Sequence, residues 1–417
     1  MRNPEYQDQS KGSYFNVLLL LISPLVSYCI ALLNYKNPSS KNVVWFFSAF
    51  FGFCLQIPAG LTGDSAVYRD KFLEYYQNNH DFDYLFSLFF SNRGHIEIVG
   101  NLISVTVAQF TGNYHYLFLC YGLFFGYFFS RNIAYMYKHF TGNLRNGSIL
   151  LTFALTFVIP IWNINGFDFW TASQVFVFAL LPIIYENKYR RIIFLLLCPL
   201  IHFSFYFMIL ICILFYFVKN FKKVLVVSFI LSYFFTGIDP AQFAFIFNYF
   251  PDILTERTEA YVNSTKSNTG GNILRIINMI YSFCIYFVFY RSYIKNKMFI
   301  ANNRNIERLF LFSFYIIAVF NVLSVIPSVG RFLLIGQMFI FISLFILLNN
   351  SRFKSYQIIS DSLNSIRIVL IVFWVISMVR YLFPILGIGS IISNPFLVWF
   401  FVEDDIVIGN VLEFLNN

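Results

Sequence analysis

Several ionisable side chains lie inside or at the edges of long apolar stretches, where an uncompensated charge is costly and is usually kept for function. They are Asp64, Arg93, Glu97, Asp168, His202, Arg257, Arg275, Arg331 and Arg380. A guanidinium group is planar, stays charged and binds phosphate oxygens through paired hydrogen bonds. A carboxylate or an imidazole beside it could accept a proton from a hydroxyl group. Arginines that converge on one cavity would therefore suit a phosphate or pyrophosphate held next to a reacting hydroxyl.

Each of these side chains also has a structural interpretation. An arginine can extend to the membrane interface or pair with an acid, and a lone histidine in an apolar run is commonly a hydrogen-bonded structural residue. Glu97 opens an apolar segment and needs a partner, which Arg93 could supply from one helical turn earlier. His202 lies between Pro199 and Ser204, where a helix is expected to break. The sequence alone leaves both interpretations open.

Nucleotide and zinc motifs are missing from the sequence. There is no GxxxxGK[ST] or GxGxxG loop, and neither an HExxH motif nor a Cys/His cluster. We therefore predict no cofactor and no metal site, although the carboxylates of the polar loops leave a divalent ion open as an alternative. The cysteines lie in apolar stretches and form no CxxC pair, so neither a disulfide nor a metal site is indicated. They are Cys29, Cys54, Cys120, Cys198, Cys212 and Cys284.

The composition is that of a membrane protein. Of the 417 residues, 58% are hydrophobic and 12% are charged, against about 25% charged residues in soluble domains. Many apolar runs are long enough to cross about 30 Å of hydrocarbon as helices. We predict an all-α polytopic integral membrane protein with about 11–13 transmembrane helices, including re-entrant or short ones, in a single domain over residues 1–417. Spans are expected near 14–33, 43–59, 114–136, 148–164, 171–186, 203–218, 223–237, 272–291, 308–327, 331–349 and 366–387, with 95–111 and 190–200 ambiguous.

The net charge of +9 is explained by basic loops, which favour the cytoplasmic side, and not by nucleic-acid binding. The two large loops 60–94 and 238–271 are less basic and are expected outside, as amphipathic segments on the bilayer surface. Basic clusters that should be cytoplasmic are Lys36/Lys41, Arg131–Arg145, Lys188–Arg191, Lys219–Lys223, Arg291–Arg308 and Arg352–Arg367.

One apolar run, 192–218, has basic clusters at both ends, Lys188–Arg191 and Lys219–Lys223. A single straight span cannot place both ends on the cytoplasmic side. Pro199 interrupts helical hydrogen bonding, so we predict a hairpin of two short helices that turns near 199–203, with His202 at the turn. A re-entrant or half-buried helix over 95–111 would likewise keep the neighbouring basic loops on one side.

Short motifs recur in a definite order along the chain. After the second expected span, Gly63 and Asp64 are followed by Tyr68 and Phe72, and Glu97 opens the next apolar segment. His202 comes late in a split apolar run, Arg257 and Tyr261 lie in the second large loop, and Arg331 lies near the outer end of a late span. This arrangement resembles that of the EpsG/Wzy-like family of O-antigen, capsular and exopolysaccharide repeat-unit polymerases.

The resemblance implies a metal-independent glycosyltransferase of the bacterial inner membrane, with a GT-C-like architecture. Such an enzyme joins oligosaccharide units carried on undecaprenyl pyrophosphate at the periplasmic face, without a nucleotide. Its partners would be these lipid-linked oligosaccharides and the bilayer. A chain-length regulator is a possible further partner, and no nucleic acid is expected. We predict catalytic roles for Asp64, Glu97 and His202, and substrate binding by Tyr68, Arg69, Arg93, Arg257, Tyr261, Arg275, Arg331 and Arg380.

Two other classes of protein compete with this interpretation. A flippase or exporter of the same lipid-linked units would share a cationic cavity, but typical members have two pseudo-symmetric halves, which this sequence does not show. An O-antigen-type ligase or a membrane acyltransferase is the other alternative. A ligase differs from a polymerase only in its acceptor, so the sequence separates the two poorly.

Overall fold

A computed structural model describes residues 15–57, 63–90, 97–140, 146–236, 238, 269–326, 329–350 and 353–409. Over these residues the chain is helical and has no strand beyond two isolated bridges, Leu55–Leu386 and Gly387–Val407. The predicted all-α class is confirmed.

Each predicted span overlaps a helix of the structure, although the ends of the helices differ from the predicted bounds. The bundle consists of α2 (Pro24–Leu33), α3 (Ser40–Phe53), α7 (Tyr114–Lys138), α8 (Asn146–Val158), α9 (Phe167–Glu186), α10 (Ile192–Ile201), α11 (Phe205–Val218), α12 (Lys222–Ser232), α15 (Thr269–Lys295), α17 (Arg304–Leu323), α18 (Phe332–Asn350) and α19 (Phe353–Ser377). Shorter elements are α4 (Asp64–Gln77), α5 (Phe82–Phe90), α6 (Val99–Ala108), the 3-10 turn η1 (Ile161–Gly166), α16 (Lys297–Asn302), the 3-10 turn η5 (Val329–Arg331), the π-helical turn η6 (Met378–Leu382), α20 (Ile388–Ile392) and α21 (Pro395–Val398).

Five helical stretches of the described residues are long and apolar enough to cross a membrane. They are Tyr114–Lys138, Gly147–Glu186, Arg304–Leu323, Val329–Asn350 and Ile359–Leu382. The outer helices also expose apolar side chains over large areas, which soluble monomers rarely do. On α11 and α19 these include Leu210, Ile213, Leu214, Phe217, Ile368, Ile371, Val372 and Val375. These are the features of an α-helical membrane protein.

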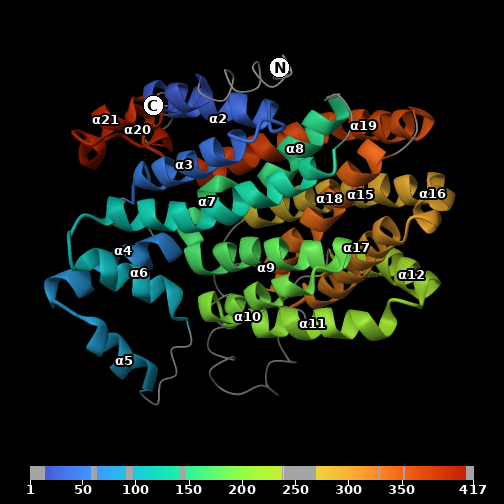
Figure 1. Ribbon diagram of the computed structural model, residues 1–417, viewed down its shortest axis with the longest axis horizontal. Coiled ribbons are helices and arrows are strands. Elements are labelled where there is room, and N and C mark those ends of the chain that lie inside the picture. The colour runs from blue at the N-terminus through green and yellow to red at the C-terminus, as the bar shows by residue number, and fades with distance from the viewer. Residues whose placement is uncertain are drawn as a thin grey trace, which may run out of the picture.

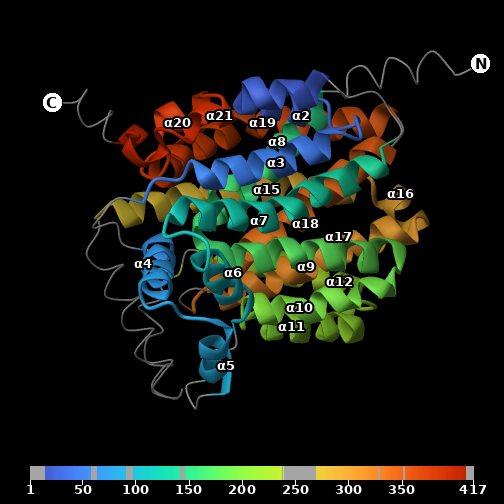
Figure 2. The ribbon, with the colours of Figure 1, turned by 60° about the vertical axis from the view of Figure 1, so that its left-hand side comes forward.

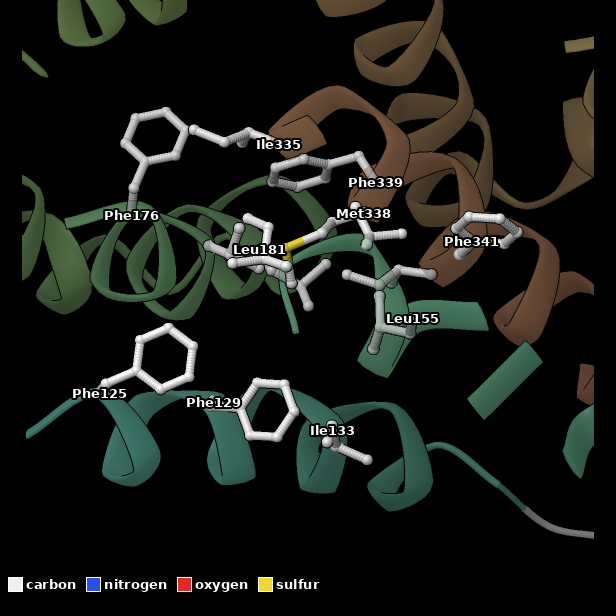
Figure 3. Packing of buried hydrophobic residues seen from close by; sticks show 14 of the residues in the cluster. Phe125, Phe129, Ile133, Leu155, Phe176, Leu181, Ile335, Met338, Phe339 and Phe341 are labelled. Carbon is white, nitrogen blue, oxygen red and sulfur yellow. The ribbon is translucent and has the colours of Figure 1, made fainter. Parts of the chain in front are cut away.

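The helices form two adjoining rows. One row runs α2, α3, α7, α9 and α10, and the other runs α12, α17, α18, α19 and α15; α9 contacts α17, and α8 contacts α18. Figure 3 shows the interior between the rows, where Phe125 and Phe129 of α7 lie below Phe176 of α9 and Phe339 of α18. Almost every residue of α18 is buried, so this helix is covered by protein on all sides.

Helices α3 and α7 approach each other at three glycines. A side-chain carbon on Gly122 would lie 2.2 Å from the backbone oxygen of Ser48, and one on Gly126 would lie 2.3 Å from the Ser48 Cβ. A carbon on Gly52 would lie 2.0 Å from the backbone oxygen of Phe118. Gly122 and Gly126 are spaced as in GxxxG motifs, which let membrane helices pack backbone to backbone.

Replacing Gly122 by Ala is therefore expected to push α3 and α7 apart and to destabilise the fold by about 1–3 kcal/mol, as overpacking does. Thermal unfolding of the detergent-purified protein should show a melting temperature lower by several degrees. Gly330→Ala is the matched control, because no described atom lies within 4 Å of its added carbon. Equal melting temperatures for the two variants would contradict this account of the helix contact.

Basic segments gather at one end of the bundle, as predicted. Lys138 at the end of α7 and Lys188 after α9 both pair with Glu186, at 3.2 and 3.0 Å between nitrogen and oxygen. Lys222 at the start of α12 pairs with Glu307 at the start of α17, at 2.6 Å. We call this the basic end. In Figures 1 and 2, α16 lies at this end on the right, whereas α4, α5 and α6 lie at the opposite end on the left.

The apolar run 192–218 is a helical hairpin, which confirms the prediction made from its basic flanks. The chain reverses between α10 and α11, so that the Tyr189 hydroxyl before α10 lies 3.2 Å from the Tyr216 hydroxyl near the end of α11. Pro199 lies in the last turn of α10, and His202 follows directly after that helix. The turn carries His202 to the end opposite the basic end.

In the described part of the segment 95–111, where a re-entrant or half-buried helix is predicted, the structure has one short helix, α6. The backbone N–H of Ile98 donates to the backbone oxygen of Leu200 at 2.9 Å, and the Gln109 side-chain amide donates to the backbone oxygen of His80 at 2.7 Å. Helix α6 is thus tied to the α10–α11 turn at its beginning and to the α4–α5 connection at its end. The described part of the loop 60–94 contains two helices, α4 and α5.

Candidate active site

Helix α4 presents three polar side chains on one face. Asp64, Tyr68 and Lys71 are spaced by about one and two helical turns. Gly63 precedes the helix with a φ of 130°, a conformation that only glycine adopts readily, and this turn places Asp64 in the first position of the helix. The carboxylate of Asp64 lies beside η1, where a side-chain carbon on Gly166 would be 3.3 Å from its Oδ2.

Asp168 meets this face of α4 from the first turn of α9. The Tyr68 hydroxyl donates to Asp168 Oδ2 at 3.1 Å, and the backbone N–H of Asp168 lies 3.4 Å from the Tyr68 oxygen, to which it donates. The other carboxylate oxygen, Oδ1, is shielded from solvent and has no donor among the described residues. It lies against Gly100 of α6, where an added side-chain carbon would be only 2.4 Å away. A glycine at this position lets α6 pack directly on the carboxylate.

The electrostatics of α4 reflect this crowding of charges. Burial raises the pKa of Tyr68 well above its usual value, and the negative charges of Asp168 and Asp64 add to the effect. Burial also lowers the pKa of Lys71, while the carboxylates of Asp168 and Glu97 act in the opposite direction. Lys71 is therefore the cation of an otherwise acidic neighbourhood.

A second pair of groups joins α6 to the α10–α11 turn. His202 Nε2 lies 3.7 Å from Glu97 Oε1, and both side chains are partly exposed. On the other side of the ring, the backbone N–H of Ser204 donates to His202 Nδ1 at 3.3 Å, and the Ser204 hydroxyl lies 2.7 Å from the same nitrogen. The imidazole is thus held between a carboxylate and a serine.

Arg331 approaches this pair from η5. Its guanidinium carbon lies 5.7 Å from the centroid of the Phe169 ring, and that ring packs at nearly a right angle against the His202 ring, with 5.3 Å between the centroids. Phe169 follows Asp168 directly in α9. The buried Phe169 ring therefore contacts both the imidazole and the arginine.

These contacts bring together side chains from four separate parts of the chain: α4, the start of α6, the start of α9 and the α10–α11 turn. We call them the carboxylate–histidine cluster: Asp64, Tyr68, Lys71, Glu97, Asp168 and His202. Chemically, the cluster can accept and donate protons at the rim of an apolar bundle, and Arg331 can supply a fixed positive charge beside it. No group of three or more His, Cys, Asp or Glu side chains placed to hold a metal ion occurs in the described part of the chain.

The structure brings five of the predicted site residues to this place: Asp64, Tyr68, Glu97 and His202 in the cluster, and Arg331 next to it. Three others, Arg93, Arg257 and Tyr261, lie outside the described residues, as does almost all of the loop 238–271.

The remaining predicted arginines lie on other surfaces. Arg69 donates to the backbone oxygen of Ile57 at 2.6 Å and pairs with Asp70 at 2.7 Å, beside a cleft of about 370 Å³ that Ile57 lines. Arg275 is half-buried in the first turns of α15, and Arg380 is exposed in η6, with its guanidinium 5.7 Å from the ring of Tyr381. Their predicted role in substrate binding stays a prediction.

Three side chains of this site are absent from the predicted set: Lys71, Asp168 and Ser204. Lys71 could have been found from its helical spacing, because it follows Asp64 by about two turns and Tyr68 by about one. Arg69 is next to Tyr68 in the sequence and therefore lies on another face of the helix. Asp168 is among the ionisable side chains singled out from the sequence, but no role is predicted for it there, and its role is visible only from its contact with Tyr68. The role of Ser204 could be recognised only from the geometry of the α10–α11 turn, which places its hydroxyl beside His202.

No family model, curated protein or solved structure matches this chain.

Proposed function

We propose that this protein is a membrane glycosyltransferase that polymerises oligosaccharide repeat units linked to undecaprenyl pyrophosphate. The observation that carries the proposal is the Glu97–His202 pair, with 3.7 Å between Oε1 and Nε2, at one end of a bundle whose outer faces are apolar. An acid–base pair at the rim of a lipid-facing bundle suits a substrate that has a polar, reacting head and a polyprenyl tail.

The roles follow from the chemistry of each group. The Glu97–His202 pair would supply the base that removes the proton from the acceptor hydroxyl. Arg331 would stabilise the negative charge that builds on the departing pyrophosphate, because a preorganised guanidinium acts most strongly where charge develops. Asp64, Tyr68, Lys71 and Asp168 would bind the hydroxyl groups of the sugar next to the reacting bond. The polyprenyl tails would lie in grooves between the outer helices.

The charge distribution supports an orientation for this chemistry. Loops rich in Lys and Arg are retained on the cytoplasmic side, so the basic end would face the cytoplasm of a bacterial cell. The cluster lies at the opposite end and would face the periplasm, where lipid-linked repeat units are joined. Further short helices would cross or enter the bilayer beside the five long stretches, to give the predicted 11–13 spans of a GT-C-like architecture.

Deletion of the gene in the organism that encodes it tests the proposal. Loss of a polymerase should leave single repeat units on the cell surface, because export still works and chain extension does not. Complementation with the wild-type gene should restore long chains. A surface with no repeat units at all would indicate a flippase or exporter, and an unchanged polymer would refute the proposed activity.

A further inference from the structure

We infer that Glu97 is the group that accepts the proton, and that Ser204 is a positioning residue which holds His202 as the neutral imidazole with its proton on Nε2. This assignment rests on the proposed function, and it settles which member of the Glu97–His202 pair acts as the base.

The tautomer follows from the donors around the ring. The backbone N–H of Ser204 points at His202 Nδ1 at 3.3 Å, and an N–H group can only donate. Nδ1 must therefore present its lone pair, and in a neutral imidazole the proton then sits on the other nitrogen, Nε2. The Ser204 hydroxyl, 2.7 Å from Nδ1, can donate to the same lone pair. Nε2–H is left facing the Glu97 carboxylate.

The fold keeps Ser204 in this position. The backbone N–H of His202 donates to Cys198 at 2.9 Å and that of Phe205 donates to His202 at 3.1 Å, so both sides of the turn are fixed. Ser204 directly precedes α11, but its hydroxyl makes no capping bond to that helix. The hydroxyl is turned to the imidazole instead. The backbone N–H of Ser204 cannot rotate away. Protonation of Nδ1 would therefore place two N–H donors against each other, which is unfavourable.

The solvent exposure of the two side chains also favours Glu97 as the base. The Glu97 side chain is 34% exposed and the His202 side chain is 21% exposed, so the carboxylate is the easier of the two for a substrate to reach. Nε2–H faces the carboxylate at 3.7 Å from Oε1, and on substrate binding this contact would shorten to a hydrogen bond that orients the carboxylate, as neighbouring groups orient catalytic bases elsewhere. His202 therefore acts through Glu97 and does not itself take the proton.

The reaction balances with Glu97 as the base. The acceptor hydroxyl gives its proton to the Glu97 carboxylate while its oxygen forms a bond to the anomeric carbon. The bond between that carbon and the pyrophosphate oxygen breaks, and its electron pair leaves with the lipid pyrophosphate. Glu97 then releases the proton to water, and His202 stays neutral throughout.

The tautomer can be measured without any activity assay. The ¹⁵N NMR spectrum of the full-length protein with labelled histidine distinguishes Nδ1–H from Nε2–H rings, and the His202 signal is identified by its loss in His202→Gln. We expect a protonated Nε2 and a bare Nδ1 at neutral pH. A protonated Nδ1 would overturn the assignment.

The Ser204→Ala variant gives the functional counterpart. Without the hydroxyl, Nδ1 is easier to protonate, and an imidazolium beside Glu97 makes the carboxylate a weaker base. Other charged groups near the ring, Asp168, Lys71 and Arg331, are unchanged by this substitution. Chain extension should fall by about three- to fourfold near pH 6, where about three quarters of unrestrained imidazoles are protonated, and should approach the wild-type rate near pH 8.

Two variants serve as comparisons. Ser204→Thr keeps the hydroxyl and should restore the wild-type pH profile, and Ser365→Ala removes an exposed helix serine and should leave the profile unchanged. An equal loss at both pH values in Ser204→Ala, or a wild-type profile, would overturn the role of Ser204. If the wild-type protein extends no chains at all, the proposed function fails, while the NMR result still decides the tautomer.

Discussion

Replacing Glu97 by Gln should abolish chain extension, with a loss of about 10²–10⁴-fold, the range that a positioned general base contributes. Glutamine keeps the size and the polar contact with His202 Nε2 but cannot accept a proton. The measurement is the initial rate of chain extension by purified protein, with folding checked by thermal unfolding. A purely structural Glu97 would instead show a lowered melting temperature with activity lost in proportion to folded protein.

The matched control for this substitution is Asp361→Asn, which removes an exposed carboxylate from α19. Its rate should equal that of the wild-type protein. A Glu97→Gln variant that folds normally and extends chains at the control rate would rule out Glu97 as the base.

Replacing Arg331 by Lys should lower the turnover number by about 10²–10³-fold, the loss typical of removing one group that stabilises transition-state charge. Lysine keeps the positive charge but loses the planar fork that binds two phosphate oxygens and stacks on the Phe169 ring. The effect should appear mainly in kcat, because charge on the leaving pyrophosphate develops in the transition state. Steady-state kinetics over a range of lipid-linked donor concentrations measure the split between kcat and KM.

An exposed arginine at the basic end provides the comparison for Arg331. Arg304→Lys, at the start of α17, should leave both kinetic parameters unchanged. Normal turnover in Arg331→Lys, or a loss seen only in KM, would contradict a role in stabilising the leaving group.

Most of the fold could be predicted because apolar length and loop charge are strong signals in membrane proteins. The predicted spans 14–33 and 148–164 run through Pro24 and Pro160, where the structure breaks the helices because proline lacks an N–H. The hairpin of α10 and α11 followed from its basic flanks together with Pro199. Helix ends were harder to predict. Helix α19 begins at Phe353, well before the predicted span 366–387. The prediction missed its first turns because they contain charged residues, which lower the hydropathy of the segment.

The site could be predicted residue by residue but not as an assembly. Asp64, Glu97 and His202 stood out because ionisable groups are costly at the edges of apolar segments. The contact of Tyr68 with Asp168 joins residues 100 positions apart, and no local pattern encodes that pairing. The choice of Arg69 over Lys71 gave weight to residue type, whereas helical periodicity decides which side chain shares a face with Asp64 and Tyr68.

The most direct test of the central claim uses purified protein in lipid vesicles, supplied only with an undecaprenyl-pyrophosphate-linked repeat unit and no nucleotide. The account predicts a ladder of products, each longer by one repeat unit, with release of undecaprenyl pyrophosphate at each step and no ladder from Glu97→Gln. Unchanged substrate with a folded wild-type protein, or movement of the substrate across the bilayer without chain growth, would contradict it.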